Sequence, residues 1–177
     1  MLELLSPAGS MEALRAAVQN GANAVYLGYD QFNARMNAKN FSADELQEAI
    51  VYCHVRGVKV HLTLNTLVLD REMRRAADLI RMAAAFGVDA FIVQDLGVVS
   101  LCREIAPDVP VHASTQMSIH SLEGVLEAAA LGCSRVVLSR VLPASEIAYI
   151  CKKSPVEIEV FVHGALCMCY SGQCYLS

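Results

Sequence analysis

The sequence predicts an incomplete (β/α) barrel of the TIM-barrel type, an α/β fold with about seven parallel strands and six helices. Three observations support this prediction. Short apolar runs alternate with amphipathic segments along the whole chain, which is the order of elements in a parallel α/β fold. The runs are nearly continuous in apolar residues, as in strands covered by helices. Several runs also carry polar residues at every second position, which a barrel can accommodate in its interior.

The expected elements follow from glycines and helix caps. Four apolar runs open with a glycine, in "GANAVYLG", "GVKVHLTLN", "GVDAFIVQD" and "GCSRVVLSR", as strands do after the C-cap of a helix. The segment "SADELQEAIVYCHVRG" has apolar residues three and four positions apart and begins with Ser42, a favourable N-cap. We expect strands near residues 2–6, 24–28, 58–64, 90–94, 110–114, 135–139 and 157–162. Helices are expected near residues 10–20, 42–56, 70–86, 96–105, 121–131 and 143–152.

The alternation within strands favours a barrel over a doubly wound sheet. His61, Thr63 and Asn65 share one face of their strand, and the residues between them are aliphatic. The same pattern recurs in "VHASTQ" and in "EIEVFVHG". A doubly wound sheet needs both faces apolar, whereas a barrel can collect polar groups inside. No Gly-x-Gly-x-x-Gly turn follows the first run, which argues against the nucleotide-binding alternative. The eighth strand of a complete barrel is missing.

The composition limits the class of protein. A chain of 177 residues, 55% of them hydrophobic, predicts one folded domain over residues 1–177. Because the sequence shows neither a signal peptide nor an apolar run of roughly 18 residues, we expect a cytoplasmic protein without a membrane partner. A net charge of −4 argues against a domain that grips phosphate backbones by itself. In this setting the seven cysteines are expected to be thiols, metal ligands or redox groups.

Polar residues follow most of the expected strands at the carboxyl end, where barrel enzymes place their active sites. We expect catalytic roles for four residues, His163, Glu159, Gln116 and Asn65, and substrate binding by four more, Arg35, Asn37, Ser114 and Arg140. The loop "YDQFNARMNAKNF" exceeds the usual roughly 2–6 residues. We interpret it as a lid or an anion-binding loop, with a solvated surface excursion as the alternative. For Glu159 the alternative is an internal salt bridge with Arg135.

Other histidines and cysteines have simpler interpretations. His54 lies in a helix pattern and is expected at the surface or in helix packing. For His61 and His112 two interpretations stay open, hydrogen-bonded core residues or functional groups. Four cysteines fall singly in helices or at a strand entry, where we expect packing as small hydrophobic residues: Cys53, Cys102, Cys133 and Cys151.

Three cysteines gather near the end of the sequence. Cys167, Cys169 and Cys174 have the spacing C-x-C-x4-C in a glycine-bounded loop. Clustered loop thiols suggest a zinc or iron–sulfur site, although such sites usually take one thiolate more than this neighbourhood supplies. A nucleophilic cysteine with His163 as general base is an alternative, and so are inert thiols. The spacing favours a metal or cluster over the nucleophile.

The segment "EVFVHGALCMCYSGQCYLS" resembles the signature of the collagenase-like peptidase family U32 at every defined position. The resemblance extends over the chain through "ELLSPAG", "GANAVYLG", "TLNT", "VQDLGV", "HASTQ" and "VLSR". It implies an open or truncated barrel followed by further sequence. In characterised hydroxylation members it also implies a 4Fe-4S cluster, whose ligand positions match Cys167 and Cys174. Cys169 occupies a slot often filled by a small residue in relatives, so no ligand role is carried over to it.

The resemblance also implies a function. "HASTQ" with "YSGQCYLS" is most similar to the branch implicated in hydroxylating a cytidine of large-subunit ribosomal RNA. We therefore expect iron–sulfur-dependent, oxygen-independent hydroxylation of ribosomal or transfer RNA by the full-length protein, with RNA as partner and prephenate as a candidate co-substrate. The alternatives are a peptidase of unknown catalytic type, as the family was first labelled, and a non-catalytic scaffold in a paired complex.

Two expectations concern the chain as it stands. The remaining cluster ligands of the family lie downstream of Ser177, so we expect a fragment or truncated product that carries no intact cluster and is inactive. An open barrel exposes the edges of its first and last strands, whose backbone groups need partners. We therefore expect a homodimer that forms through these edges.

Overall fold

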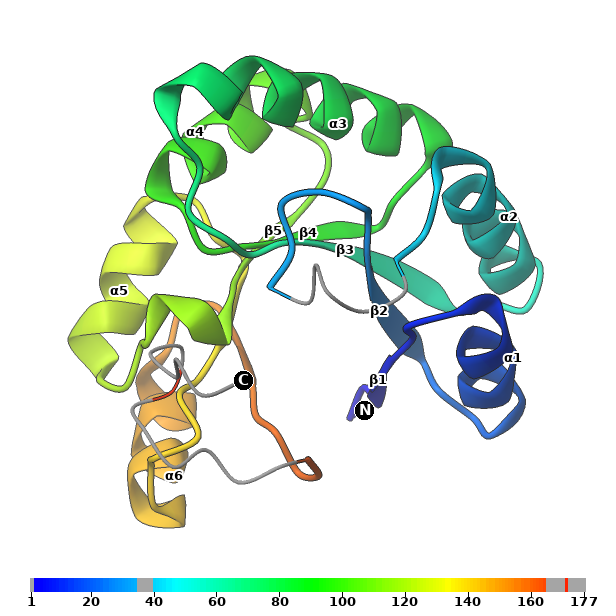
Figure 1. Cartoon of the computed structure of the whole chain (residues 1–177). Helices are drawn as coiled ribbons and strands as arrows, with labels where there is room; N and C mark the ends of the chain where they lie inside the picture. Colours follow the sequence, from blue (N-terminus) through cyan, green and yellow to red (C-terminus); the bar gives the residue numbers. More distant parts are fainter. Residues whose placement is uncertain (1, 35–39, 165–170, 172–177) are drawn as a thin grey trace.

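The computed structural model describes residues 2–34, 40–164 and 171. Within these residues seven strands form one sheet, arranged in chain order with every neighbouring pair parallel. The sheet curls into a half-barrel with helices around its outer side (Figure 1). The strands are β1 (Leu5–Pro7), β2 (Ala24–Gly28), β3 (Lys59–Leu64), β4 (Ala90–Val93), β5 (Val111–Ala113), β6 (Arg135–Val137) and β7 (Glu157–Glu159). The predicted incomplete barrel is confirmed.

Six α-helices and two 3-10 helices complete the described part. They are α1 (Met11–Gln19), α2 (Ala43–His54), η1 (Asp70–Glu72), α3 (Met73–Phe86), α4 (Leu96–Ile105), η2 (Thr115–Met117), α5 (Leu122–Ala130) and α6 (Ala144–Lys153). Ser42 caps α2 as expected: its side chain accepts a hydrogen bond from the Glu45 amide, and the Glu45 carboxylate accepts one from the Ser42 amide. Ser10, Asp95 and Ser121 cap α1, α4 and α5 in the same general way.

The observed elements differ from the expected ones mainly at their ends. The strand expected over 157–162 ends at Glu159, and the following residues are exposed, with Val162 at 85%. An edge strand has a partner on one side only, so its pairing stops where β6 stops. The helix expected over 70–86 begins with the 3-10 turn η1. The expectation that Cys151 is packed in the core is wrong, because Cys151 is exposed on α6.

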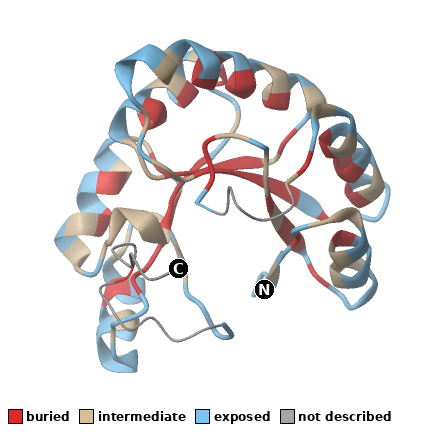
Figure 2. Cartoon of the chain, in the orientation of Figure 1, coloured by how far each residue is buried: buried red, intermediate tan, exposed pale blue. Residues whose placement is uncertain are grey.

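The hydrophobic core lies between the convex side of the sheet and the helices. Val60, Leu62 and Leu64 of β3 are each no more than 1% exposed and belong to this core. Figure 2 shows the buried residues along the strands and on the helix sides that face them. His61 and Thr63 alternate with these aliphatic residues and so face the concave interior. The polar face that the sequence predicts for the barrel interior is therefore present in β3.

Candidate functional site

The carboxyl ends of the strands bring together most of the described candidate residues. Asn65 follows β3, Ser114 follows β5, and Arg140 and His163 come shortly after β6 and β7. The carboxyl ends of parallel strands in a barrel meet at one rim. Glu159 is the exception among the described candidates, because it is still within β7. Arg35, Asn37, Cys167 and Cys174 lie outside the described residues.

The loop after β2 is packed onto this rim. The Asn33 side chain is buried and donates hydrogen bonds to the Tyr29 carbonyl and to Asn40 Oδ1. A Cβ on Gly28, the last residue of β2, would lie 2.8 Å from Asn33 Cγ, so a side chain there would displace Asn33. The Ala34 amide donates to Asn65 Oδ1 at 3.0 Å. The described part of the loop is therefore held against the end of β3, and the interpretation of residues 35–39 as a lid or an anion-binding loop stays a prediction outside the described residues.

The residues after β5 form a short 3-10 helix at the centre of the rim. Ser114 is buried, and its Oγ accepts a hydrogen bond from the Gln116 amide at 3.2 Å, which makes Ser114 the N-cap of η2. Gln94 Nε2 donates to the Gln116 carbonyl at 3.3 Å. The Gln116 side chain has no hydrogen-bond partner within the described residues. The backbone of Gln116 is thus held in place, and its side-chain amide is available to a ligand.

Ser171 is tied to η2 by two hydrogen bonds. The hydroxyl groups of Thr115 and Ser171 lie 2.9 Å apart, and Ser118 Oγ donates to the Ser171 carbonyl at 2.6 Å. Ser171 is only 1% exposed. It lies between Cys167 and Cys174 in the sequence, so its contacts connect the cysteine segment to the segment "HASTQ". Among the described residues, no group of three or more histidine, cysteine or acidic side chains could hold a metal.

A cleft of about 280 Å³ opens at the carboxyl ends of β6 and β7. Its lining includes Ser139, Arg140, Phe161 and His163, together with Leu142, which precedes α6, and Ile147 in the first turns of α6. The Arg140 guanidinium lies over the Phe161 ring, 5.2 Å from its centre. His163 is exposed at this cleft, and no carboxylate of the described residues lies within hydrogen-bonding distance of it. The cleft combines a cation, an aromatic ring and polar side chains.

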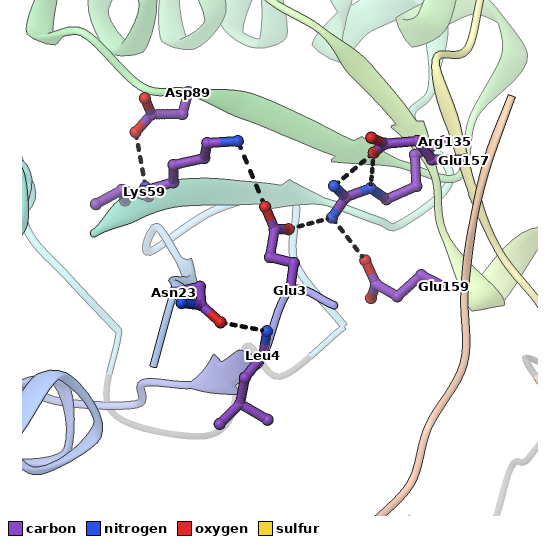
Figure 3. A network of polar contacts seen from close by, with 9 residues as sticks. Glu3, Leu4, Asn23, Lys59, Asp89, Arg135, Glu157 and Glu159 are labelled. Atoms are coloured by element: carbon purple, nitrogen blue, oxygen red, sulfur yellow. Dashed lines mark hydrogen bonds and ion pairs between the residues drawn. The ribbon is translucent and has the colours of Figure 1, made fainter. Parts of the chain in front are cut away.

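Below the rim, one arginine gathers three carboxylates inside the half-barrel (Figure 3). Arg135 of β6 donates to Glu157 Oε2 at 2.6 and 2.8 Å and to Glu159 Oε2 at 3.3 Å, both on β7. It also donates to Glu3 Oε1 at 2.6 Å, close to the start of β1. The internal salt bridge that the sequence left open for Glu159 is therefore present. The arginine links the two edge strands of the sheet, which are not hydrogen-bonded to each other.

The network shifts the pKa values of its members in different directions. Burial alone would raise the pKa of Glu3, but the hydrogen bond and positive charge of Arg135 lower it below the usual value. Burial raises the pKa of Glu159, and the attraction of Arg135 offsets only part of that effect. Burial opposes the charged form of Arg135, yet hydrogen bonds from Arg135 to Glu3 and Glu157 raise its pKa. Arg135 therefore stays charged.

Two buried histidines lie beside this network. The rings of His61 and His112 meet edge to face, with centres 5.0 Å apart. Their Nδ1 atoms are buried and have no hydrogen-bond partner within the described residues. Burial lowers the pKa of His61 to about 4 and that of His112 to about 3, with the charge of Arg135 contributing in both cases. Both rings are neutral near pH 7. The interpretation as fully hydrogen-bonded core residues is wrong for their Nδ1 atoms.

The remaining histidine and cysteine expectations concern the outer layer. His54 lies at the surface, as expected, with Nε2 2.8 Å from Asp89 Oδ2. Cys53, Cys102 and Cys133 are buried. Burial raises the pKa of Cys53 and Cys133 to about 11 and that of Cys102 to about 12. These thiols stay protonated near neutral pH and are unreactive.

Sequence reasoning missed two features of the site. The first is the ion pair of Glu3 with Arg135, which joins residues 132 positions apart. A buried arginine needs several carboxylate partners, and this requirement is the signal that could have been used, because "LELLSP" shows no polar alternation around Glu3. The second is the anchoring of Ser171 on Thr115 and Ser118. No pattern within either segment indicates that pairing.

A parallel half-barrel whose polar residues gather at the carboxyl ends of its strands defines the class: a (β/α) barrel-type protein with its candidate site at that rim. Within this class the family can be stated. The model of Peptidase family U32 matches residues 9–177, and this chain belongs to that family. The resemblance inferred from the motifs is confirmed.

Curated relatives match nearly the whole chain. It is 39% identical over 175 residues to the tRNA hydroxylation protein P1 of Bacillus subtilis, which covers 99% of this chain and 42% of that protein. It is 43% identical over 176 residues to the 23S rRNA 5-hydroxycytidine C2501 synthase of Escherichia coli, covering 99% and 26%. It is 42% identical over 183 residues to the uncharacterized protease MJ0090 of Methanocaldococcus jannaschii, covering 100% and 44%. The chain spans less than half the length of these relatives.

Solved structures share the fold. A U32 peptidase, Mk0906, superimposes with a TM-score of 0.73 at 15% identity, covering 90% of this chain and 68% of that one. Thiamine phosphate pyrophosphorylase from Pyrococcus furiosus superimposes with a TM-score of 0.62 at 19% identity, covering 90% and 74%. At these identities the likeness concerns the fold alone. No helix in the described part of the chain has both the length and the apolar character to cross a membrane.

Proposed function

We propose that this chain forms the barrel of a protein that hydroxylates ribosomal or transfer RNA. The observation that carries the proposal is its identity of 39% and 43%, over nearly its whole length, to relatives named for tRNA hydroxylation and for rRNA hydroxycytidine synthesis. The rim supports it, because amide, hydroxyl and guanidinium groups are suited to the edges and phosphates of unpaired nucleotides. The activity proposed is that of the whole protein, of which this chain is the part with the rim.

Iron–sulfur dependence and independence of molecular oxygen belong to the proposal. Cys167 and Cys174 would supply two thiolates, the donors that iron–sulfur clusters take, and sequence after Ser177 would supply the remaining ligands. The bound cluster would supply electron transfer. The described residues are compatible with this role, because Ser171, between the two cysteines in the sequence, is buried and held by η2.

The other predicted residues receive roles that match their chemistry. The amides of Asn65 and Gln116 would contact the edge of the target base, and Arg140 would pair with a phosphate. His163 would accept or donate a proton at the target base. Arg35 and Asn37 stay predicted substrate-binding residues, and prephenate stays the candidate co-substrate.

Nucleoside mass spectrometry of cellular RNA tests the proposal. Ribosomal and transfer RNA from cells that lack the gene should lose one hydroxylated pyrimidine nucleoside, and the intact gene should restore it. Growth without oxygen should leave the nucleoside in place if molecular oxygen is not the donor. An unchanged set of nucleosides in the deletion strain would reject RNA hydroxylation.

A hydrolase is the second candidate, because two other relatives carry the names protease and collagenase. Ser139 and His163 line the same cleft and are its clearest candidate nucleophile and base. A Ser/His/Asp triad also needs a carboxylate that orients the histidine, and none of the described residues provides one within hydrogen-bonding distance of His163. Peptide cleavage by metal-free protein that Ser139→Ala abolishes would favour the hydrolase.

A further inference from the structure

The cleft between the ends of β6 and β7 has the chemistry of a nucleotide site. Its volume of about 280 Å³ lies just below the range for small-molecule sites, roughly 300–1,000 Å³. A space of this size accommodates a small flat group such as one base. A base would therefore have to leave its stack before it could enter, as single-stranded RNA allows.

The aromatic wall of the cleft is exposed. Phe161 is 40% exposed although it is large and apolar, and Arg140 lies over its ring at 5.2 Å. Exposed aromatic rings and arginine planes are the surfaces on which proteins stack unpaired bases. The guanidinium also brings positive charge next to the ring, which complements a phosphodiester backbone. Aromatic and cationic groups thus occur together in a chain whose net charge is −4.

The floor of the cleft holds a polar group that lacks a partner. Ser139 is 5% exposed and lines the cleft, and its backbone amide donates to the Ile119 carbonyl at 2.9 Å. Its hydroxyl has no hydrogen-bond partner within the described residues. In the described part of the chain, the fully buried side-chain atoms that lack a partner are His61 Nδ1 and His112 Nδ1, so the Ser139 hydroxyl is accessible from the cleft. Ser139 is therefore placed to bond the polar edge of a molecule in the cleft.

We propose that this cleft binds one unpaired nucleotide of the RNA substrate. The base stacks on Phe161, its edge bonds Ser139, and its phosphate pairs with Arg140. This inference rests on the proposed function and adds the residues that recognise the RNA. The cationic and aromatic lining favours a polyanion with flat bases over a peptide, because it offers an exposed ring to a base and a positive charge to a phosphate.

Binding of a short, labelled single-stranded RNA to the purified protein, followed by fluorescence anisotropy, tests the proposal. Phe161→Leu keeps an apolar side chain but removes the ring, and should weaken binding by about tenfold or more. Phe161→Trp keeps a stacking surface and should bind within about threefold of the parent. Arg140→Ala should weaken binding. It should also reduce the slope of log affinity against log salt concentration by the amount that about one phosphate contact contributes.

A matched control is present on the outer side of the barrel. Arg56 lies 3.7 Å over the Tyr52 ring of α2, so Arg56→Ala removes the same charge and the same type of contact away from the cleft. It should leave RNA affinity and salt slope nearly unchanged. If Phe161→Leu fails to fold, as seen from its thermal transition, Arg140→Ala and Phe161→Trp still provide the test.

Three results would overturn the inference. The first is unchanged RNA affinity in Phe161→Leu, and the second is an equal effect of Arg140→Ala and Arg56→Ala on RNA affinity. The third is tighter binding of a collagen-like peptide than of RNA, together with loss of peptide binding in Phe161→Leu. Failure of the proposed function would be visible separately, as unchanged nucleosides in the deletion strain. Unchanged RNA affinity in the variants, with the nucleoside lost on deletion, would reject this cleft alone.

Discussion

At the scale of single residues, Arg135 holds the two ends of the half-barrel together. Its side chain is 11% exposed and pairs with Glu3, Glu157 and Glu159. Glu157 is 68% exposed and contributes little, because water screens it. Glu3 and Glu159 are mostly buried, so their charges depend on the guanidinium. Removal of the cation would leave like charges facing one another in the interior.

We expect Arg135→Met to lower the free energy of unfolding by roughly 3 kcal/mol, the scale of breaking a buried ion pair. Lys59→Met is the matched control, because Lys59 also contacts Glu3, at 3.4 Å, but is 57% exposed. It should cost less than about 1 kcal/mol. Urea unfolding at neutral pH measures both. Equal costs for the two variants would show that Arg135 is no more than a surface partner.

The buried histidines should make stability depend on pH. Their pKa values in the folded chain, about 4 for His61 and about 3 for His112, lie below the ordinary value of 6.5 that applies after unfolding. The unfolded chain therefore binds more protons as pH falls through 6.5, and stability is lost down to about pH 4 for His61 and about pH 3 for His112. Above pH 6.5 this contribution is fully present.

The parent should become less stable between about pH 7 and about pH 5. We expect His112→Leu to lose roughly 1–2 kcal/mol less free energy of unfolding over this range. The substitution itself should cost little at pH 7, because His112 Nδ1 has no partner to lose within the described residues. His54→Leu, at the exposed histidine, is the control. The same pH dependence of stability in the parent and in His112→Leu would show that His112 is not its source.

At the scale of elements, η2 organises the rim. Ser114 caps it from the buried side, Gln94 holds its backbone, and Thr115 and Ser118 bind Ser171. A helix of three residues has no stability of its own, so these contacts determine its geometry. The contacts of Ser171 and the geometry of η2 should therefore be energetically linked.

A double-mutant cycle measures that link. Thr115→Val removes a hydroxyl at nearly constant shape, and Ser171→Ala removes its partner. We expect each to lower the free energy of unfolding by about 1 kcal/mol, with a coupling of about 0.5–1.5 kcal/mol between them. Thr115→Ser, which keeps the hydroxyl, should show little change. Additive effects of Thr115→Val and Ser171→Ala would mean that the two hydroxyls do not interact in solution.

At the scale of the whole molecule, β1 and β7 each have one strand neighbour within the described residues. We predict a homodimer through these edges, because unpaired strand edges seek partners. Val162, which is 85% exposed just after β7, is a test position. Val162→Lys should shift the light-scattering mass from dimer to monomer, and Val51→Lys on the outer helix α2 should not. A parent that is monomeric at high concentration would remove the prediction.

The architecture could be predicted because local patterns determine it. The alternation around His61, the glycine before each apolar run and the cap at Ser42 all depend on residues close in sequence. The end of β7 could not be predicted from local patterns. The residues "VFV" after Glu159 have strand composition, but the pairing of β6 with β7 ends at Val137 and Glu159. The pairs Glu3–Arg135 and Thr115–Ser171 join distant segments and appear only after folding.

We propose that the whole protein hydroxylates RNA with the help of Cys167 and Cys174. Nucleoside mass spectrometry of RNA from deletion cells that carry either Cys174→Ser or Cys151→Ser tests it most directly, since Cys151 is an exposed thiol remote from the motif in sequence. We expect the hydroxylated nucleoside to be absent with Cys174→Ser and restored with Cys151→Ser. Full restoration of the hydroxylated nucleoside by the Cys174→Ser variant would contradict a role of Cys174 in the hydroxylation.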